Sequence, residues 1–167
     1  MKRIALLCSL LLAMAISAIA APPDNQRTKK VPLDISGIMD GRFVFDVVTW
    51  EPLVFDTIGD VAGTLRGYLG FSKLHTKHRP DSDGTLPDGE FTIVAANGDE
   101  IRGNYAGTAY YASADQAYGN ALFVISGGTG RFEGATGTIN ASFVETFDDP
   151  SWESAKVTWA LIGAVDY

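Results

Sequence analysis

The side chains best suited to chemistry in this chain are a glutamate and two tyrosines set among apolar residues. Glu145 lies two positions after Phe143, and Tyr105 and Tyr111 fall on one face of their own segment. Alternate side chains of a strand share a face, so Glu145 would lie beside an apolar wall that also includes Trp159. A carboxyl in such surroundings has a raised pKa and can act as an acid or a base. We predict these five residues as ligand-binding; alternatively, Glu145 lies at a strand end in water.

The two histidines, His75 and His78, are a weaker candidate pair. Three residues apart on a strand, they would face opposite sides of a sheet. A zinc site usually needs a third protein ligand as well. We therefore interpret both as solvated side chains near a loop and predict no metal site from them.

A cluster of acidic residues follows the histidines. Its Asp-x-Asp-Gly core and later glutamate resemble the centre and end of a calcium loop, yet the first ligand position would be Arg79 and the ninth Pro87. A polar loop without metal is the default interpretation. The alternative is weak calcium binding by four carboxylates, those of Asp81, Asp83, Asp88 and Glu90.

The N-terminus has the organisation of a secretory signal peptide. Lys2 and Arg3 precede the apolar run 4–18, and small residues allow cleavage after Ala20. A membrane anchor is the alternative, but the run is short for a bilayer span. We predict a signal peptide over 1–20, a flexible N-terminal segment over 21–32 and one domain over 33–167. The protein would be secreted or periplasmic, with no membrane association after cleavage.

Composition narrows the function further. The chain has 167 residues, of which 46% are hydrophobic and 20% charged, enough for the core of one domain. A formal net charge of −7 argues against a nucleic-acid partner, which would require a basic surface. The single cysteine, Cys8, lies in the predicted signal peptide, so the mature chain would use no disulfide or thiolate. We predict no cofactor.

The elements that must position these side chains are strands. Turn signals at Asp40-Gly41 and Asn97-Gly98 predict two hairpins, and 61–76 alternates like one strand bent at glycines. Further strands are expected over 90–96, 99–111 and 156–165, and no segment keeps a helical period for three turns. We expect at most one short helical turn.

About eight such segments without helical crossovers must pair as antiparallel neighbours. Glycine recurs inside the strands, which favours a closed barrel, and a two-sheet sandwich is the alternative. The predicted fold class is therefore all-β, an antiparallel and about eight-stranded closed barrel after an N-terminal signal peptide.

The most distinctive stretch is GGTGRFEGATG, residues 127–137, between two predicted strands. A strand rather than a helix follows it, so it lacks the helix N-terminus of a phosphate-binding loop. We interpret it as architecture: Phe132 would plug a barrel end, and five glycines would form the turn. Positive φ is expected at Gly127, Gly128 and Gly130, and close packing at Gly134 and Gly137.

This stretch resembles the GG(S/T)GxFEGxxG signature of plant allene oxide cyclases and the GGTGxFxxAxG of dirigent proteins. Bacterial secreted proteins with the allene-oxide-cyclase-like barrel are similar over most of the mature chain. The resemblance implies an eight-stranded antiparallel barrel with a mostly apolar cavity and allows a homo-oligomer. The cyclases carry a Glu-x-Asn pair on the first strand; here the counterpart is Asp46-Val47-Val48. Asp46 and Glu145 are thus the two catalytic candidates.

Three classes of function fit these features. The first is a barrel that binds a small apolar molecule or serves as a non-catalytic secreted module. The second is an isomerase or a stereochemistry-directing, dirigent-like protein acting in the cavity, so the sequence leaves enzymatic activity undecided. The third is an interaction protein that uses Trp50 or Trp152, which fall in loop-like sequence.

Overall fold

The structure, a computed structural model, describes residues 30–49, 52–65, 68–69, 71–79, 83–148 and 153–167. The predicted signal peptide, Trp50, Trp152 and Asp81 lie outside these residues. The described elements are nine strands and one 3-10 turn. In chain order they are β1 Lys30–Phe45, β2 Pro52–Leu65, β3 Tyr68–Leu69, β4 Phe71–His78, β5 Thr85–Ala95, β6 Glu100–Tyr111, β7 Gln116–Gly128, η1 Gly130–Phe132, β8 Thr136–Phe147 and β9 Ser154–Asp166.

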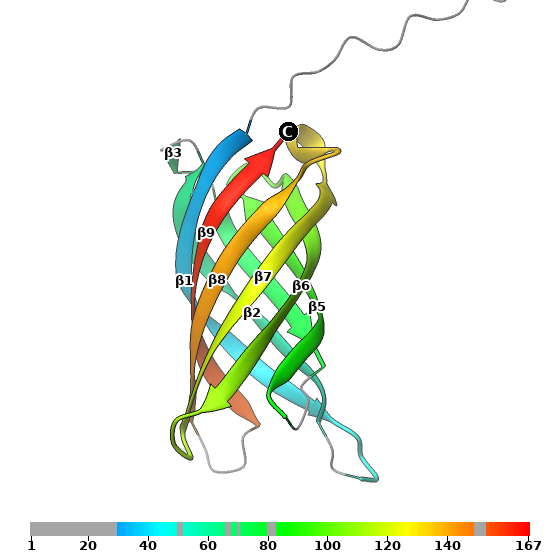
Figure 1. Ribbon diagram of the computed structural model, residues 1–167, viewed down its shortest axis with the longest axis vertical. Coiled ribbons are helices and arrows are strands. Elements are labelled where there is room, and N and C mark those ends of the chain that lie inside the picture. Colours follow the sequence, from blue (N-terminus) through cyan, green and yellow to red (C-terminus); the bar gives the residue numbers. More distant parts are fainter. Residues whose placement is uncertain (1–29, 50–51, 66–67, 70, 80–82, 149–152) are drawn as a thin grey trace, which may run out of the picture.

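The strands close into one antiparallel barrel (Figure 1). Long strands that follow one another in the chain are paired, β2 with β4 across the two-residue β3. The first strand, β1, pairs with both β2 and β9 and so joins the two ends of the sheet. Among the described strands, closure pairs every long one on both sides. The prediction of an eight-stranded closed barrel is confirmed, and the sandwich alternative is wrong.

Large aromatic side chains fill the middle of the barrel. Trp159, Phe55 and Phe123 are among the largest fully buried residues. The ring centroid of Phe123 lies 5.5 Å from that of Trp159 and 4.6 Å from that of Tyr105. Burying each such side chain stabilises the fold by roughly 1.5–3 kcal/mol. The barrel interior is thus a packed core over much of its length.

The glycine-rich turn between β7 and β8 closes the upper end of the barrel, beside the C-terminus (Figure 1). Phe132 is fully buried, and its ring lies 5.1 Å from that of Tyr167, edge to face. Gly130 has a φ of +57°, and a Cβ there would overlap the Asp99 carboxylate. That carboxylate accepts a hydrogen bond from the backbone N–H of Arg131 at 3.3 Å. The β5–β6 hairpin is thereby tied to the glycine-rich turn.

The backbone conformations of the five glycines in this turn differ in part from the prediction. Gly127, Gly130, Gly134 and Gly137 have positive φ, whereas Gly128 does not. A Cβ on Gly128 would instead collide with the backbone of β6 and with η1, so this position needs space. One short helical turn was expected, and η1 is that turn.

The predicted hairpin at Asp40-Gly41 is wrong, because β1 runs straight through it. Met39 and Gly41 are buried while Asp40 is exposed, so the strand alternation is unbroken. The Asp40 carboxylate forms an ion pair with Lys156 on the neighbouring strand β9. A Cβ on Gly41 would press on the ring of Phe55, so this glycine fits the interior and does not make a turn.

The single strand predicted over 61–76 is also wrong. The chain reverses there, and β2 pairs with β4 so that Asp60 lies opposite Lys73. In the sequence, the alternation of apolar residues continues through the point where the chain reverses. Two antiparallel strands therefore looked like one. The hairpin at Asn97-Gly98 is confirmed, with Gly98 at a φ of +89°.

The barrel begins at Lys30, three residues before the predicted domain start at 33. Within the described part of the chain, no helix has the length and apolar character to cross a bilayer.

Candidate functional site

The lower half of the barrel interior contains hydrogen bonds among buried polar side chains. The hydroxyls of Thr57 on β2 and Thr76 on β4 lie 2.6 Å apart. Beside this pair, the hydroxyl of Tyr105 on β6 lies 2.7 Å from Nδ1 of His78. All four residues are buried. Inside an apolar barrel each of these groups needs a partner, and the network supplies one.

The register of three strands makes this contact possible. Tyr105 lies directly opposite Gly89 on β5, and the tyrosine ring occupies the space that a side chain there would fill. The ring therefore passes over β5 and reaches His78 on β4. A larger residue at Gly89 would displace the tyrosine and break the network.

Burial sets the protonation states of this pair. It lowers the pKa of His78 to about 4. It is also the main cause that raises the pKa of Tyr105 above its ordinary value, with a smaller contribution from the charge of Glu145. Near neutral pH the imidazole is uncharged and the phenol keeps its proton. The hydrogen bond between the Tyr105 hydroxyl and Nδ1 then runs in either direction, according to which ring nitrogen of His78 carries the proton.

Glu145 lies on the inward face of β8 and is only 6% exposed. The alternative that placed it in water is therefore wrong, because the alternation of β8 runs inward as far as Phe147. Burial raises the pKa of Glu145 to about 7. Its charge also raises the pKa of Tyr105 and of Tyr111, so it lies within electrostatic reach of both. At neutral pH this carboxyl can either donate or accept a proton.

Trp159 contributes a hydrogen-bond donor that lacks an acceptor. Its Nε1 is buried and finds no partner among the described residues. The Trp159 ring faces Phe143 across the β8–β9 pair at 4.6 Å. Glu145 lies opposite Val157, which makes Trp159 its diagonal neighbour, within reach of a long side chain. An unsatisfied buried donor costs about 1–3 kcal/mol, so a ligand or water that accepts from it would stabilise the protein.

Four of the five predicted ligand-binding residues lie together in the interior: Tyr105, Phe143, Glu145 and Trp159. Tyr111, on the same strand as Tyr105, is 54% exposed at the lower end of the barrel.

The second catalytic candidate, Asp46, has a different role. It follows the end of β1, where its Oδ1 accepts hydrogen bonds from the backbone N–H groups of Val48 and Thr49 at 2.7 and 2.9 Å. These bonds lower the pKa of Asp46. The carboxylate holds the turn after β1, and the Glu-x-Asn pair of the cyclases has no counterpart on β1.

Sequence reasoning missed His78, Thr57 and Thr76. The prediction of a solvated His78 is wrong, because β4 extends as far as this residue and its alternation carries Thr76 and His78 inward. His75 faces outward, with Nε2 2.5 Å from the Asp56 carboxylate, so the prediction of opposite faces is confirmed. The signal that could have identified them is the alternation of 74, 76 and 78, which the single-strand interpretation of 61–76 cut short.

Weak calcium binding by the acidic cluster stays an alternative to the polar loop without metal. Asp83 accepts a hydrogen bond from the backbone N–H of Thr85 at 2.8 Å and so begins β5. Asp88 and Glu90 are exposed on β5, and Asp81 lies outside the described residues. Among the residues that the structure describes, no three histidine, cysteine or acidic side chains are grouped to hold a metal ion.

A surface hollow of about 190 Å³ borders His78 near the lower end of the barrel. Its other lining residues are Val54, Lys77, Arg79, Asp88 and Glu90. One edge of the buried network is therefore close to solvent at this point.

Comparison with known proteins gives structural neighbours only. No protein-family model and no curated protein matches the chain. The fold is similar to that of the pterocarpan synthase dirigent protein GePTS1, with a TM-score of 0.49 and 18% identity over 92% of this chain and 99% of that chain. For the pterocarpan synthase dirigent protein PsPTS1 the TM-score is 0.44, with 16% identity over 83% of this chain and 96% of that chain.

Both neighbours are dirigent proteins, one of the two barrel families whose signature the glycine-rich turn resembles. At these identities the likeness concerns the fold alone, and the function of this chain has to be inferred from its own residues.

Proposed function

We propose that this protein binds a small, mostly apolar molecule in the lower half of its barrel. Tyr105, Glu145 and Trp159 supply the polar contacts, and Phe143 belongs to the apolar wall. Two neighbouring groups carry the proposal. Glu145 is a buried carboxyl with a pKa of about 7, and the buried indole N–H of Trp159 has no acceptor among the described residues. Buried polar groups are normally hydrogen-bonded, and a ligand bearing one hydroxyl or carbonyl would accept a hydrogen bond from this N–H.

The lower end of the barrel is the natural entrance for such a ligand. The upper end is plugged by Phe132, whereas at the lower end Tyr111 is half exposed and Phe43 only partly buried. The ring of Phe147 lies 6.3 Å from that of Phe43 and 6.2 Å from that of Tyr111. Movement of these three rings would open a path to Glu145.

A second candidate function is proton transfer on the bound molecule, as in an isomerase or a stereochemistry-directing protein. The observation that favours it is again the pKa of Glu145, because a general base works best near the pH at which it titrates. Ionised Glu145 would take a proton from the ligand and return it at another atom. In the tautomer in which Nδ1–H of His78 donates to the Tyr105 oxygen, the Tyr105 hydroxyl would donate a hydrogen bond to the negative charge that develops.

We further propose that the protein is exported by the segment 1–20 and acts in the periplasm or the medium. Sequencing of the mature N-terminus from a native culture tests this proposal. A chain that begins at Ala21 is expected, and a chain that retains Met1 would contradict it.

Native mass spectrometry of the protein purified from its own culture is the first test of ligand binding. A retained small molecule is expected, with a mass that identifies it. Fluorescence titration with 2-naphthol then measures affinity, since this probe has two apolar rings and one hydroxyl. Glu145→Gln and Tyr105→Phe should each weaken binding about fivefold to tenfold, the loss of one buried hydrogen bond.

Glu133→Gln is the matched control, because Glu133 is an exposed carboxylate at the upper end of the barrel. Its affinity for 2-naphthol should equal that of the unmodified protein. Equal affinities in all three variants would remove Tyr105 and Glu145 from the site. No retained molecule together with no binding of 2-naphthol would leave the non-catalytic module as the function.

A further inference from the structure

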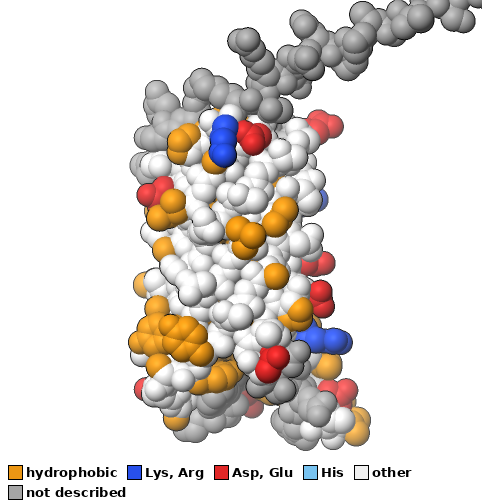
Figure 2. Space-filling view, viewed as in Figure 1, with side chains coloured by type: hydrophobic (Ala, Val, Ile, Leu, Met, Phe, Trp, Pro, Cys, Tyr) orange, Lys and Arg blue, Asp and Glu red, His pale blue; other side chains and the backbone are white. Residues whose placement is uncertain are grey.

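The outer wall formed by β7 and β8 is free of charged side chains. Outward positions on β7 are Gln, Tyr, Asn, Leu, Val and Ser, and on β8 they are Thr, Asn, Ser and Val. The chain as a whole carries 33 charged residues, 13 basic and 20 acidic. Figure 2 shows this face with its charged side chains mainly at the edges and ends. The neutral wall is therefore a distinct region of the surface.

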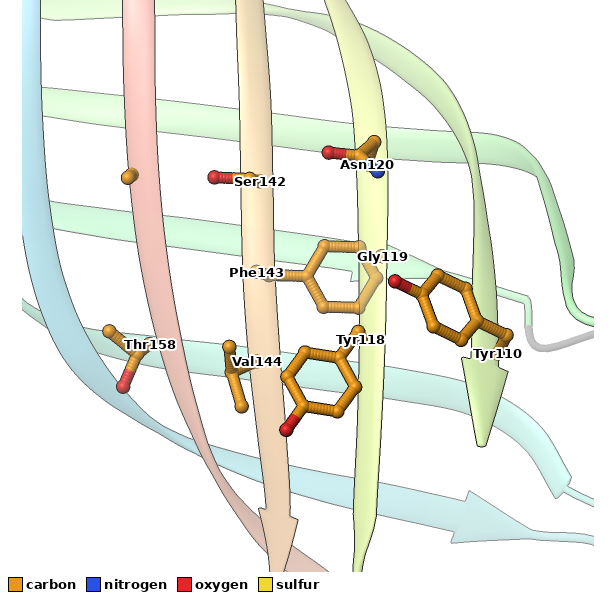
Figure 3. Close-up of a pocket in the computed structure, with 9 residues that line it drawn as sticks. Tyr110, Tyr118, Gly119, Asn120, Ser142, Phe143, Val144 and Thr158 are labelled. Atoms are coloured by element: carbon orange, nitrogen blue, oxygen red, sulfur yellow. The ribbon is translucent and has the colours of Figure 1, made fainter. Parts of the chain in front are cut away.

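A groove of about 270 Å³ lies on this wall (Figure 3). Tyr110, Tyr118 and Asn120 border it on β6 and β7, and the backbone of Gly119 contributes to its floor. Across β8 and β9 the groove is completed by Ser142, Phe143, Val144, Thr158 and Ala160. The lining thus combines aromatic rings with amide and hydroxyl groups and contains no charge.

The two tyrosines form a platform. Their ring centroids are 5.9 Å apart and their planes differ by 23°. In Figure 3 both rings are seen face-on and lie beside each other, so their faces point out of the wall. Tyr110 is 59% exposed. The hydroxyl of Tyr118 donates to Oε1 of Gln116 at 2.5 Å, which holds its ring in this orientation.

The floor of the groove is fixed by the barrel interior. Gly119 lies opposite Phe143 on β8, and a Cβ on this glycine would overlap the phenylalanine ring. The interior ring therefore packs against bare backbone at this point, beneath the platform. All the lining residues of the groove lie on strands β6, β7, β8 and β9.

We propose that this groove binds a neutral oligosaccharide built of pyranose rings. The C–H face of a pyranose is apolar and covers an exposed aromatic ring, while its hydroxyls need neutral donors and acceptors around the edge. Asn120, Ser142 and Thr158 supply such groups. The absence of charge from the described lining favours a neutral sugar over an anionic one. Two rings side by side suit two consecutive units of an extended chain.

Titration of the protein with cellohexaose, chitohexaose and maltohexaose, followed by ¹H–¹⁵N chemical shifts, tests the proposal. At least one of the three should shift the amides of Gly119, Ser142 and Thr158, and a trigalacturonate of similar shape should not. Tyr110→Ala should weaken the binding about tenfold and Tyr110→Phe less than about threefold, because the ring face makes the contact. Ile58→Ala, which removes an exposed apolar side chain from β2, should leave it unchanged.

Tyr110 is largely exposed, so its alanine variant should fold, and the dispersion of its amide shifts checks this directly. No shift with any of the three neutral sugars would overturn the proposal. Equal binding by Tyr110→Ala would overturn it too. Sedimentation velocity gives a third outcome that would overturn it. If the unmodified protein is an oligomer and Tyr110→Ala is a monomer, a second copy of the chain occupies the groove.

Discussion

Ionisation of Glu145 should destabilise the folded protein as the pH rises. In the barrel its pKa is raised to about 7 from an ordinary value of 4.5, and burial is the cause. The unfolded chain therefore loses this proton at a lower pH than the folded protein does, and ionisation of Glu145 favours unfolding. Replacing Glu145 with Gln removes the titration while keeping a side chain of the same shape.

The magnitude follows from the two pKa values. A change from 4.5 to about 7 corresponds to roughly 3 kcal/mol of unfolding free energy. Below the pKa of the unfolded chain, ionisation of Glu145 costs the folded protein no stability. Between the two pKa values this cost grows with pH, and above about pH 7 it has reached its full size. The difference in stability between Glu145→Gln and the unmodified protein should accordingly rise by about 3 kcal/mol over this window.

Urea denaturation followed by tryptophan fluorescence, at steps from about pH 4.5 to about pH 8.5, measures this difference. The exposed Glu133→Gln variant is the control, and its difference from the unmodified protein should stay flat. A flat profile for Glu145→Gln would show that the carboxyl is solvated in the folded state. In that case the acid–base part of the proposed function fails as well.

The remaining predictions concern the rest of the interior and the upper plug. Burial lowers the pKa of His78 to about 4, so protonation of His78 should remove up to about 3 kcal/mol of stability as the pH drops from about 6.5 to about 4. Because Glu145 acts in the opposite direction over much of this window, the effect is measured as the difference in stability between the unmodified protein and His78→Gln, in a denaturation series extended to about pH 4. Gly130→Ala should cost about 1–3 kcal/mol in urea unfolding, more than Gly98→Ala, because both glycines have positive φ but only Gly130 abuts Asp99. Phe132→Ala should cost about 3–5 kcal/mol and lower the melting temperature, whereas equal melting temperatures would show that Phe132 is no plug.

The fold could be predicted from sequence because its determinants are local. Alternation identified the strands that begin at Glu100 and Ser154, and the Asn97-Gly98 pair identified a hairpin that the structure contains. The turn signal at Asp40-Gly41 misled for a physical reason. A glycine whose missing side chain makes room for Phe55 looks, in sequence, like a glycine that makes a turn.

The site could be predicted only in part, because it depends on register. Tyr105, Glu145 and Trp159 were found from alternation on their own strands. His78 was missed because the expected strand ended at 76, which cut short the alternation of 74, 76 and 78. Its contact with Tyr105 depends in addition on strand pairing and on the empty position at Gly89. Neither the pairing nor the gap is visible in the residues around His78 itself.

Buried polar groups that cost stability are found in the lower half of this barrel, whereas the upper end is a structural plug. At the upper end Phe132 is buried, Asp99 is hydrogen-bonded, and the glycines adopt the backbone that they alone tolerate. In the lower half a carboxyl is close to half ionised near neutral pH, and the N–H of Trp159 finds no acceptor in the described part of the chain. Such costs lower stability, and proteins tend to keep them where chemistry or binding uses them. A ligand is therefore better sought beside Glu145 than at the glycine-rich turn that first identifies the fold.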